Sequence, residues 1–375
     1  MMGSGLSLGR LFGIEFRLHY TWFIVFVLVV VSLSRWYFPA AYPGWNGIIY
    51  WIVGVVSSLL FFASVVAHEL AHSLVARSNG IPVRSITLFI FGGVAQITRE
   101  AKKASAEFAM AAAGPACSLA IGGLFALLWL FTQNTTEEVA AMARWLALVN
   151  VALAVFNMIP GFPLDGGRVF RSLLWRFTGN YNRSTRIATQ TGRVVGYLFI
   201  LGGISWMIIP PHDWFGGLWL AFIGWFLENA ASASYRQAQW REGLSGFTAT
   251  QVMTPDFPVV PSNITVDELV QGYIFPSGRH FFVVADEGNL KGILTLHDIK
   301  SVPRQNWGTT QVKDIMTPVD KLKIAHPDQE AVSILEQMAE SDVNQMPVVM
   351  GGRVIGLVTR DNLIRFLQVR SELSK

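Results

Sequence analysis

The sequence predicts a polytopic α-helical membrane domain, with about six transmembrane helices and short membrane-associated β segments, followed by an α+β domain made of two repeats. Three observations predict this architecture. Only 14% of the 375 residues are charged and 52% are hydrophobic, whereas a typical soluble protein has about 25% charged residues. The long apolar runs lie within residues 1–235. A short motif recurs in residues 248–375, which have an ordinary soluble composition.

The membrane domain is predicted from segments that approach the roughly 20 apolar residues needed to cross a bilayer. The fourth segment runs directly into a proline- and glycine-rich stretch, and irregular backbone at membrane depth is tolerated only inside protein or beside a water-filled cavity. The alternation in residues 9–18 indicates strands before the first span. The six predicted spans are roughly 19–34, 48–76, 106–131, 141–158, 191–209 and 214–234.

The basic residues predict the orientation, because cytoplasmic loops carry an excess of lysine and arginine. The opposite loops hold only Arg35 and Arg144 near their ends, so both termini are expected in the cytoplasm. The arginines form no continuous basic surface, which argues against a nucleic-acid partner, and the single cysteine excludes an internal disulfide. The basic connections contain Arg77, Arg84, Arg99, Lys102 and Lys103, and then Arg168, Arg171, Arg176, Arg183, Arg186 and Arg193.

Ionisable residues inside a spanning helix are costly and usually functional. The second predicted span contains His68-Glu69-Leu70-Ala71-His72, which is an H-E-x-x-H pattern. Residues four apart share a helix face, so both imidazoles can bind one zinc ion. Glu69 lies about 100° around the helix, where it can accept a proton from a water on the metal without being a ligand. Two helix histidines satisfied by hydrogen bonds are the alternative.

A third zinc ligand is expected, because a catalytic zinc ion usually has three protein ligands and a water molecule. Among the acids of residues 1–235, Asp165 stands out because it follows the break at Pro160–Leu164. Prolines and glycines unwind the chain there, so the carboxylate can turn into the membrane domain. An ordinary turn aspartate is the alternative.

Two motifs together resemble the site-2 protease family of intramembrane metalloproteases. They are His68 to His72 and the stretch from Asn157 through Pro163-Leu164-Asp165-Gly166. The resemblance implies an endopeptidase that hydrolyses transmembrane protein substrates near the cytoplasmic side of the lipid bilayer. It also implies an integral, multi-pass protein of a prokaryotic cell membrane.

The same resemblance implies the roles of individual residues. His68, His72 and Asp165 would bind one catalytic Zn²⁺ ion, and Glu69 would be the general base. Asn157 would hold the substrate backbone or the developing oxyanion, as a side-chain amide can. A buried amide that satisfies the broken backbone is the alternative for Asn157.

The segment Ser85–Ile97 is apolar and β-branched and is interrupted by two glycines. An edge strand can hold a substrate in extended form through main-chain pairing. The resemblance implies that Phe91, Gly92, Gly93 and Val94 bind the substrate in this way. A membrane-dipping hairpin with a purely structural role is the alternative.

The segment Ala113–Ser118 also resembles a motif of the family, in which asparagine often stands at the position of Ser118. Close helix packing at Gly114 would explain the segment equally well.

The soluble region repeats with a period of about 63 residues. Val252-Met253-Thr254-Pro255 recurs as Ile315-Met316-Thr317-Pro318, and Gly292-Ile293-Leu294-Thr295 recurs as Gly356-Leu357-Val358-Thr359. Such a repeat is one structural unit used twice. Each copy is expected to contain a short strand, a helix such as 328–341, two strands around a turn and a last helix.

This pattern resembles a pair of CBS (cystathionine-β-synthase-type) domains. We therefore expect a protease domain at 1–240 and CBS repeats at 248–305 and 311–370. The resemblance implies a regulatory site for an adenine nucleotide, with contacts from Thr295 and Asp298 in one repeat and from Thr359 and Asn362 in the other. A homodimerisation or substrate-docking module without a ligand is the alternative.

Two rival functions remain open on the sequence. The first is an ion or metal transporter or channel gated by CBS domains, although such a carrier should show matched broken helices in repeated halves, and residues 1–235 show one break. The second is an inactive zinc-binding scaffold, against which the presence of Glu69 argues.

Overall fold

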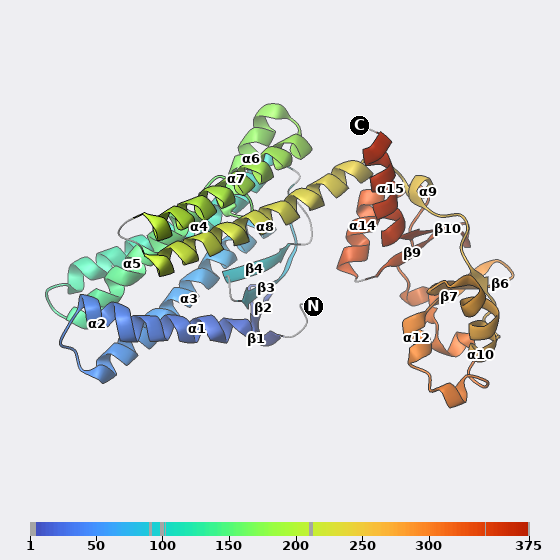
Figure 1. The fold of residues 1–375 in the computed structure, drawn as a ribbon, viewed down its shortest axis with the longest axis horizontal. Helices are drawn as coiled ribbons and strands as arrows, with labels where there is room; N and C mark the ends of the chain where they lie inside the picture. Colours follow the sequence, from blue (N-terminus) through green and yellow to red (C-terminus); the bar gives the residue numbers. More distant parts are fainter. Residues whose placement is uncertain are drawn as a thin grey trace. The chain divides into compact units, whose positions relative to one another are not determined.

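The computed structural model describes residues 5–89, 92–97, 101, 103–209, 213–341 and 343–373. The chain forms two compact units, Met1–Ala238 and Gln239–Lys375. Figure 1 shows long helices in the first unit and a mixed α+β arrangement in the second.

Among the residues that the structure describes, the first unit contains five helical stretches that are long and apolar enough to cross a membrane. The first stretch, Thr21–Ala41, joins α1 (Thr21–Ser32) to α2 (Phe38–Ala41) through a π-helical turn. These stretches confirm the first five predicted spans. The other four are α3 (Gly47–Ser78), α4 (Ala104–Thr132), α5 (Glu137–Asn157) and α7 (Tyr181–Ile208).

The sixth predicted span lies within helix α8 (Trp214–Leu244), which is not among the five stretches of the described residues that meet the spanning criteria. Helix α8 packs closely on α7. A Cβ atom built on Gly203 of α7 would lie only 2.9 Å from the Cβ atom of Ala221 in α8. Small residues at such a crossing let two helix backbones approach each other, as in membrane helix pairs.

A buried polar contact joins helices α3 and α5. Asn150 of α5 is fully buried, and its amide donates to Ser64 Oγ of α3 at 3.4 Å. It also donates to Leu146 O of its own helix at 2.8 Å. Interhelical polar contacts of this kind fix the register of one membrane helix against another.

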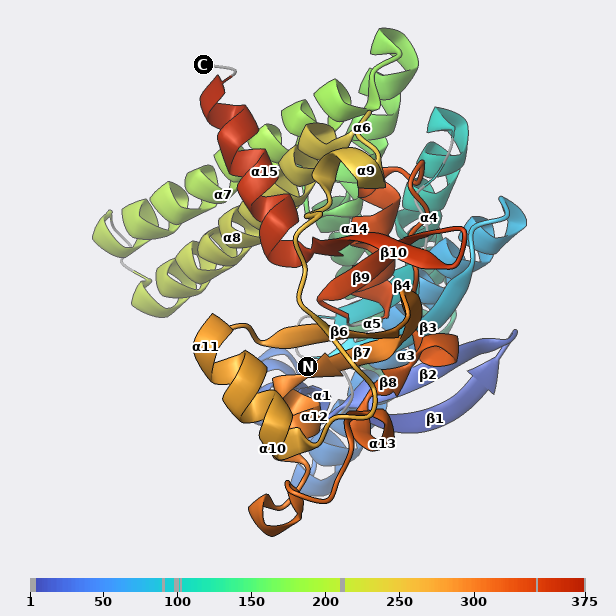
Figure 2. The ribbon, with the colours of Figure 1, turned by 90° about the vertical axis from the view of Figure 1, so that its right-hand side faces the viewer.

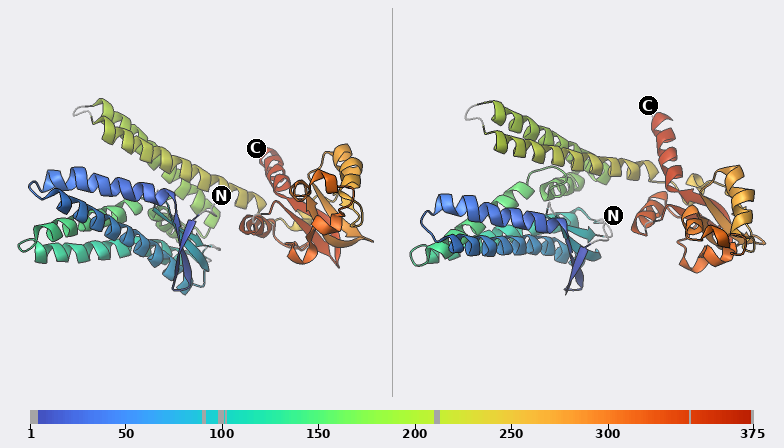
Figure 3. Two further views of the ribbon diagram at one scale, coloured as in Figure 1. Left: turned by 90° about the horizontal axis from the view of Figure 1, so that it is seen from below. Right: turned by 60° about the horizontal axis from the view of Figure 1, so that its bottom comes forward.

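A four-stranded sheet of order β1-β2-β3-β4 lies at one end of α1 and α3 (Figure 3). Strands β2 and β3 pair in parallel, and the other two pairs are antiparallel. These strands confirm the predicted β segments before the first span and within residues 85–97, and β4 forms an edge of the sheet. The strands are β1 (Gly5–Leu11), β2 (Ile14–His19), β3 (Val83–Phe89) and β4 (Gly92–Ile97).

The predicted break follows α5. Residues 158–164 are not helical, and α6 (Asp165–Thr178) begins immediately after them. Backbone hydrogen bonds hold this loop, including Phe162 N to Ala188 O of α7 at 3.3 Å and Leu164 N to Gly161 O at 3.1 Å. The loop therefore places Asp165 at the first turn of a new helix.

The second unit is built around a sheet of order β5-β6-β7-β10-β9, with β8 paired to β7 (Figure 2). Its longer helices are α14 (Ala331–Glu340) and α15 (Arg360–Leu373). The strands are β5 (Val259–Val260), β6 (Phe281–Asp286), β7 (Asn289–Thr295), β8 (Thr317–Pro318), β9 (Gln345–Met350) and β10 (Arg353–Thr359). The short helices are α9 (Ala249–Val252), α10 (Val266–Leu269), α11 (Phe275–Ser277), α12 (Leu296–Lys300) and α13 (Val312–Ile315).

The two repeats exchange their first segments. Thr254 of the first repeat pairs with Leu357 of the second, and Thr317 of the second pairs with Ile293 of the first. Each recurring M-T-P motif therefore completes the sheet of the other repeat, which confirms the predicted tandem unit. In the second repeat the strand–turn–strand–helix order is as predicted, with Gly351 and Gly352 at positive φ in the turn.

Candidate metal centre

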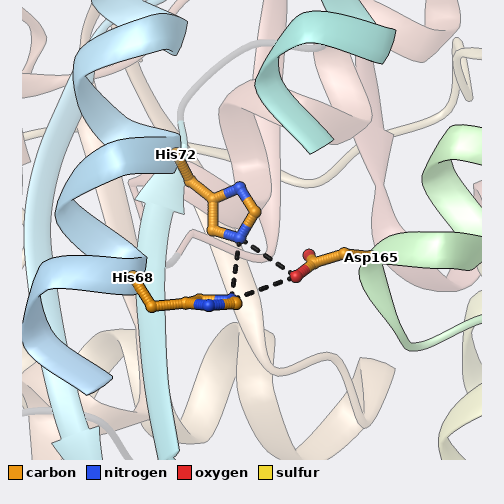
Figure 4. A group of neighbouring side chains, drawn as sticks. All are labelled: His68, His72 and Asp165. Atoms are coloured by element: carbon orange, nitrogen blue, oxygen red, sulfur yellow. Dashed lines mark hydrogen bonds and ion pairs between the residues drawn. The ribbon is translucent and has the colours of Figure 1, made fainter. Parts of the chain in front are cut away.

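Three side chains from distant parts of the chain converge in the first unit (Figure 4). His68 Nε2 and His72 Nε2 are 3.1 Å apart. The Oδ2 atom of Asp165 lies 3.1 Å from each of these nitrogens. His68 and His72 are buried and Asp165 is half-buried. The structure thus brings together the three residues expected to bind zinc.

Each candidate ligand is placed by simple helix geometry. His68 and His72 are one turn apart on α3, so both rings leave the same face of the helix. Asp165 is the first residue of α6, where the positive end of the helix dipole favours a carboxylate. Burial raises the pKa of the Asp165 carboxyl group, but the neighbouring His68 and His72 lower it, and the lowering prevails. The carboxylate is therefore ionised.

Helix α4 lines the other side of this group of residues. His72 Nδ1 lies 2.7 Å from the backbone oxygen of Met110, and His68 Nδ1 lies 2.9 Å from Ser118 Oγ. Between these two contacts, a Cβ atom built on Gly114 would overlap His72 Nε2 and lie 2.6 Å from His68 Nε2. Gly114 thus leaves open the space that a side chain would fill.

The donor set fits a zinc ion. The Met110 carbonyl can only accept a hydrogen bond, so the proton of a neutral His72 is on Nδ1. Its Nε2 lone pair then faces His68 Nε2 and an Asp165 oxygen. A cation bound among these three atoms would remove the electrostatic repulsion between their lone pairs. Four ligands around zinc at about 2.0–2.1 Å are separated by about 3.3 Å in a tetrahedron. The observed separations of 3.1 Å are close to that value.

Glu69 lies beside this centre and against the small sheet. A Cβ atom built on Gly93 of β4 would overlap Glu69 Cγ and lie 2.9 Å from Glu69 Cδ. Glu69 directly follows His68 on α3. The structure therefore places Glu69 beside both the candidate metal ligands and the edge strand.

The other residues expected to contact the substrate have different positions. Asn157 is the last residue of α5, and its amide donates to Leu153 O of the same helix at 3.0 Å. Gly92 and Val94 belong to β4, where Val94 pairs with Thr87 of β3. Phe91 lies outside the described residues.

An ion pair that sequence reasoning did not single out joins α4 to α6. Glu107 of α4 is buried and accepts from Arg171 Nε of α6 at 2.7 Å. The Arg171 guanidinium also lies over the rings of Phe162 and Tyr181, at 4.9 and 4.8 Å from their centroids. The available signal was a glutamate within the predicted span 106–131, where a carboxylate needs a partner.

The four residues expected to contact a nucleotide lie at equivalent places in the two repeats but make different contacts. Asp298 Oδ2 accepts from Thr295 N at 2.8 Å and from Thr295 Oγ1 at 2.7 Å, capping α12. Asn362 N donates to Thr359 Oγ1 at 3.1 Å, and its amide donates to Thr254 Oγ1 of the first repeat. The repeats are therefore not chemically equivalent at these positions.

Comparison with known proteins identifies the families to which the two parts of the chain are similar. The family model of Peptidase family M50 matches residues 56–144 and 132–201, and the CBS domain model matches 249–304 and 312–369. The Synechocystis sp. protein sll0528 is 37% identical over 98% of this chain and 96% of its own length. The Mycobacterium tuberculosis protein Rip3 is 35% identical over 98% of this chain and 94% of its own. Both are named as zinc metalloproteases.

A solved site-2 protease from Methanocaldococcus jannaschii is also similar, with 28% identity and a TM-score of 0.42. The match covers 62% of this chain and 96% of that one.

The apolar helices and the comparisons together define the class of protein as a zinc metalloprotease with a helical membrane domain. The chain belongs to peptidase family M50, the site-2 protease family, and carries a C-terminal CBS pair. The transporter alternative is not favoured, because relatives that match 98% of the chain are named as metalloproteases.

Proposed function

We propose that His68, His72 and Asp165 bind one catalytic Zn²⁺ ion, and that Glu69 is the general base of an endopeptidase acting on membrane-spanning proteins. One observation carries the ligand assignment. Three ligand atoms from α3 and α6 lie 3.1 Å from one another with Gly114 leaving space beside them.

When bound, Zn²⁺ supplies Lewis-acid polarisation of the peptide carbonyl and an acidified water. The protein supplies the rest. Glu69 takes the proton of the attacking water and gives it to the leaving amine. Its position one residue after His68 keeps it off the ligand face and within reach of the same space.

The substrate binds in extended form along β4. Support comes from the place of β4 at an edge of the sheet and from the close approach of Gly93 to Glu69. A strand paired there by main-chain hydrogen bonds would present its peptide bond beside the base. Gly92 and Val94 belong to the same strand, and Phe91 is proposed as a further substrate contact. Asn157 would contact the substrate backbone once the hydrogen bond from its amide to Leu153 O is broken.

Cleavage occurs near the cytoplasmic side of a prokaryotic cell membrane, with both termini and the CBS pair in the cytoplasm. The arginine-rich connection of residues 159–193 supports this orientation. Helix α8 then provides the sixth span. The domains are the protease domain at 1–240 and CBS repeats at 248–305 and 311–370.

The CBS pair regulates the protease, either by binding an adenine nucleotide or by forming a homodimer. Thr295, Asp298, Thr359 and Asn362 are the proposed nucleotide contacts. Because the Asn362 amide already bonds to Thr254, a nucleotide is expected to favour the repeat that holds Thr295 and Asp298.

Substitution of Glu69 by glutamine tests the mechanism. The amide keeps the side-chain shape but cannot accept the water proton, so the variant should retain zinc and lose cleavage of a model transmembrane substrate by at least about 100-fold. Zinc content by elemental analysis and cleavage by gel assay check this. Cleavage at the wild-type rate would refute Glu69 as base, and a wild-type protein that binds zinc without any hydrolysis would indicate an inactive scaffold.

A further inference from the structure

One ridge of α4 faces the two histidines of α3. Met110, Gly114 and Ser118 are four residues apart, so they lie on one face of the helix. Met110 O contacts His72 Nδ1 at 2.7 Å, and Ser118 Oγ contacts His68 Nδ1 at 2.9 Å. Each imidazole is therefore held from behind by an oxygen atom of the same helix.

The two oxygen atoms differ in chemistry. A backbone carbonyl only accepts, so Met110 fixes the proton of His72 on Nδ1 whatever residue stands at position 110. The Ser118 hydroxyl is the corresponding contact for His68, and it belongs to a side chain. An imidazole binds a metal through Nε2 only when its proton is on Nδ1, and the partner of Nδ1 sets that tautomer and the ring orientation.

The burial of Ser118 agrees with such a role. Its side chain is fully buried, and a buried hydroxyl is costly unless it is hydrogen-bonded. Two other buried serines, both on α3, bond to their own helix: Ser58 Oγ to Gly54 O at 2.7 Å and Ser64 Oγ to Leu60 O at 2.9 Å. Ser118 instead reaches a ring that is 50 positions away in the chain.

We propose that Ser118 is a positioning residue of the metal centre, whose hydroxyl accepts the Nδ1–H of His68 and directs the His68 Nε2 lone pair towards the zinc ion. The inference rests on the proposed function, because it takes His68 as a ligand. It adds that His72 is oriented by a backbone carbonyl and His68 by a side-chain hydroxyl. Only the hydroxyl can be removed by a single substitution.

The test uses Ser118→Ala in the full-length protein purified in detergent. The change deletes one hydroxyl and leaves the helix packing in place. Zinc affinity, measured by competition with a chelator, should fall by about 10–100-fold, as for other residues that orient a metal ligand. The visible absorption spectrum of the Co²⁺-loaded protein should change in band position or intensity, while the melting temperature of the metal-free protein stays at the wild-type value.

Two further variants separate orientation of the ligand from general packing. Ser58→Ala removes a buried hydroxyl from α3 that bonds to Gly54 O of the same helix, and should keep wild-type zinc affinity. Ser118→Thr restores a hydroxyl on the same Cβ atom and should recover affinity and the Co²⁺ spectrum.

The proposal is overturned if Ser118→Ala binds zinc as tightly as the wild type with an unchanged Co²⁺ spectrum, or if Ser58→Ala weakens binding equally. A folded Ser118→Thr variant as weak as Ser118→Ala also overturns it. A wild-type protein that binds no zinc would instead refute the proposed function. Weakened binding in Ser118→Ala alone supports the positioning role.

Discussion

Replacement of Gly114 by alanine should empty the metal centre without unfolding the protein. A Cβ atom at this position would overlap His72 Nε2 and lie 2.6 Å from His68 Nε2. Non-bonded carbon atoms prefer separations of about 3.5–4.0 Å. The methyl group would therefore stand in the space between both ligand nitrogens and α4.

The size of the effect follows from this overlap. Relief of the contact needs a shift of about 1 Å by the imidazoles or by α4, and a displacement of that size at a catalytic site can cost about 100-fold in rate. We expect zinc affinity and peptide cleavage each to fall by at least that factor. Overpacking costs about 1–3 kcal/mol, partly offset by the higher helix propensity of alanine, about 1 kcal/mol, so the protein should still fold.

A matched control exists on the same helix. A Cβ atom built on Gly123 meets no atom within 4 Å, so Gly123→Ala should keep wild-type zinc content and activity. Zinc is measured by elemental analysis after gel filtration, and cleavage with a model transmembrane substrate. Stoichiometric zinc and full activity in a folded Gly114→Ala variant would show that α4 does not border the metal site and would refute the reasoning.

Two other substitutions test the neighbouring contacts. Glu107→Gln removes the charge that faces Arg171 and should destabilise the protein by about 3 kcal/mol, because it breaks a buried ion pair by removing one charge. A lowered melting temperature together with weaker zinc binding would show that this pair holds α6 in place. Unchanged values would contradict it. Gly93→Ala places a methyl group against Glu69. This variant should keep its zinc, while its rate of cleavage falls by about 10-fold or more. Loss of zinc, or cleavage at the wild-type rate, would argue against the placement of β4 beside Glu69.

The three candidate metal ligands could be predicted from sequence to different degrees. His68 and His72 follow from a spacing of four residues on one helix, which is a local property. Asp165 could be singled out only because prolines and glycines mark a break before it. Asp165 is 97 positions from His68 along the chain. The packing of α4 and α6 brings the two residues together, and no local sequence pattern encodes that packing.

The residues that surround the candidate metal ligands were harder to predict from the sequence. Met110 acts through its backbone oxygen, so its side chain carries no signal of the role. Gly114 was open to an explanation by helix packing alone, and only the built structure shows that its missing side chain faces two imidazoles. Arg171 was noted only as a basic loop residue, whereas the structure pairs it with Glu107.

The sequence by itself determined the membrane helices, the repeated soluble unit and the two histidines with their glutamate, because composition, recurrence and helical spacing are local or additive along the chain. The tertiary structure alone decided that Asp165 reaches both imidazoles, that α4 supports them from behind and that Gly93 meets Glu69. These contacts join segments far apart in sequence, and they exist only once all the helices have packed against one another.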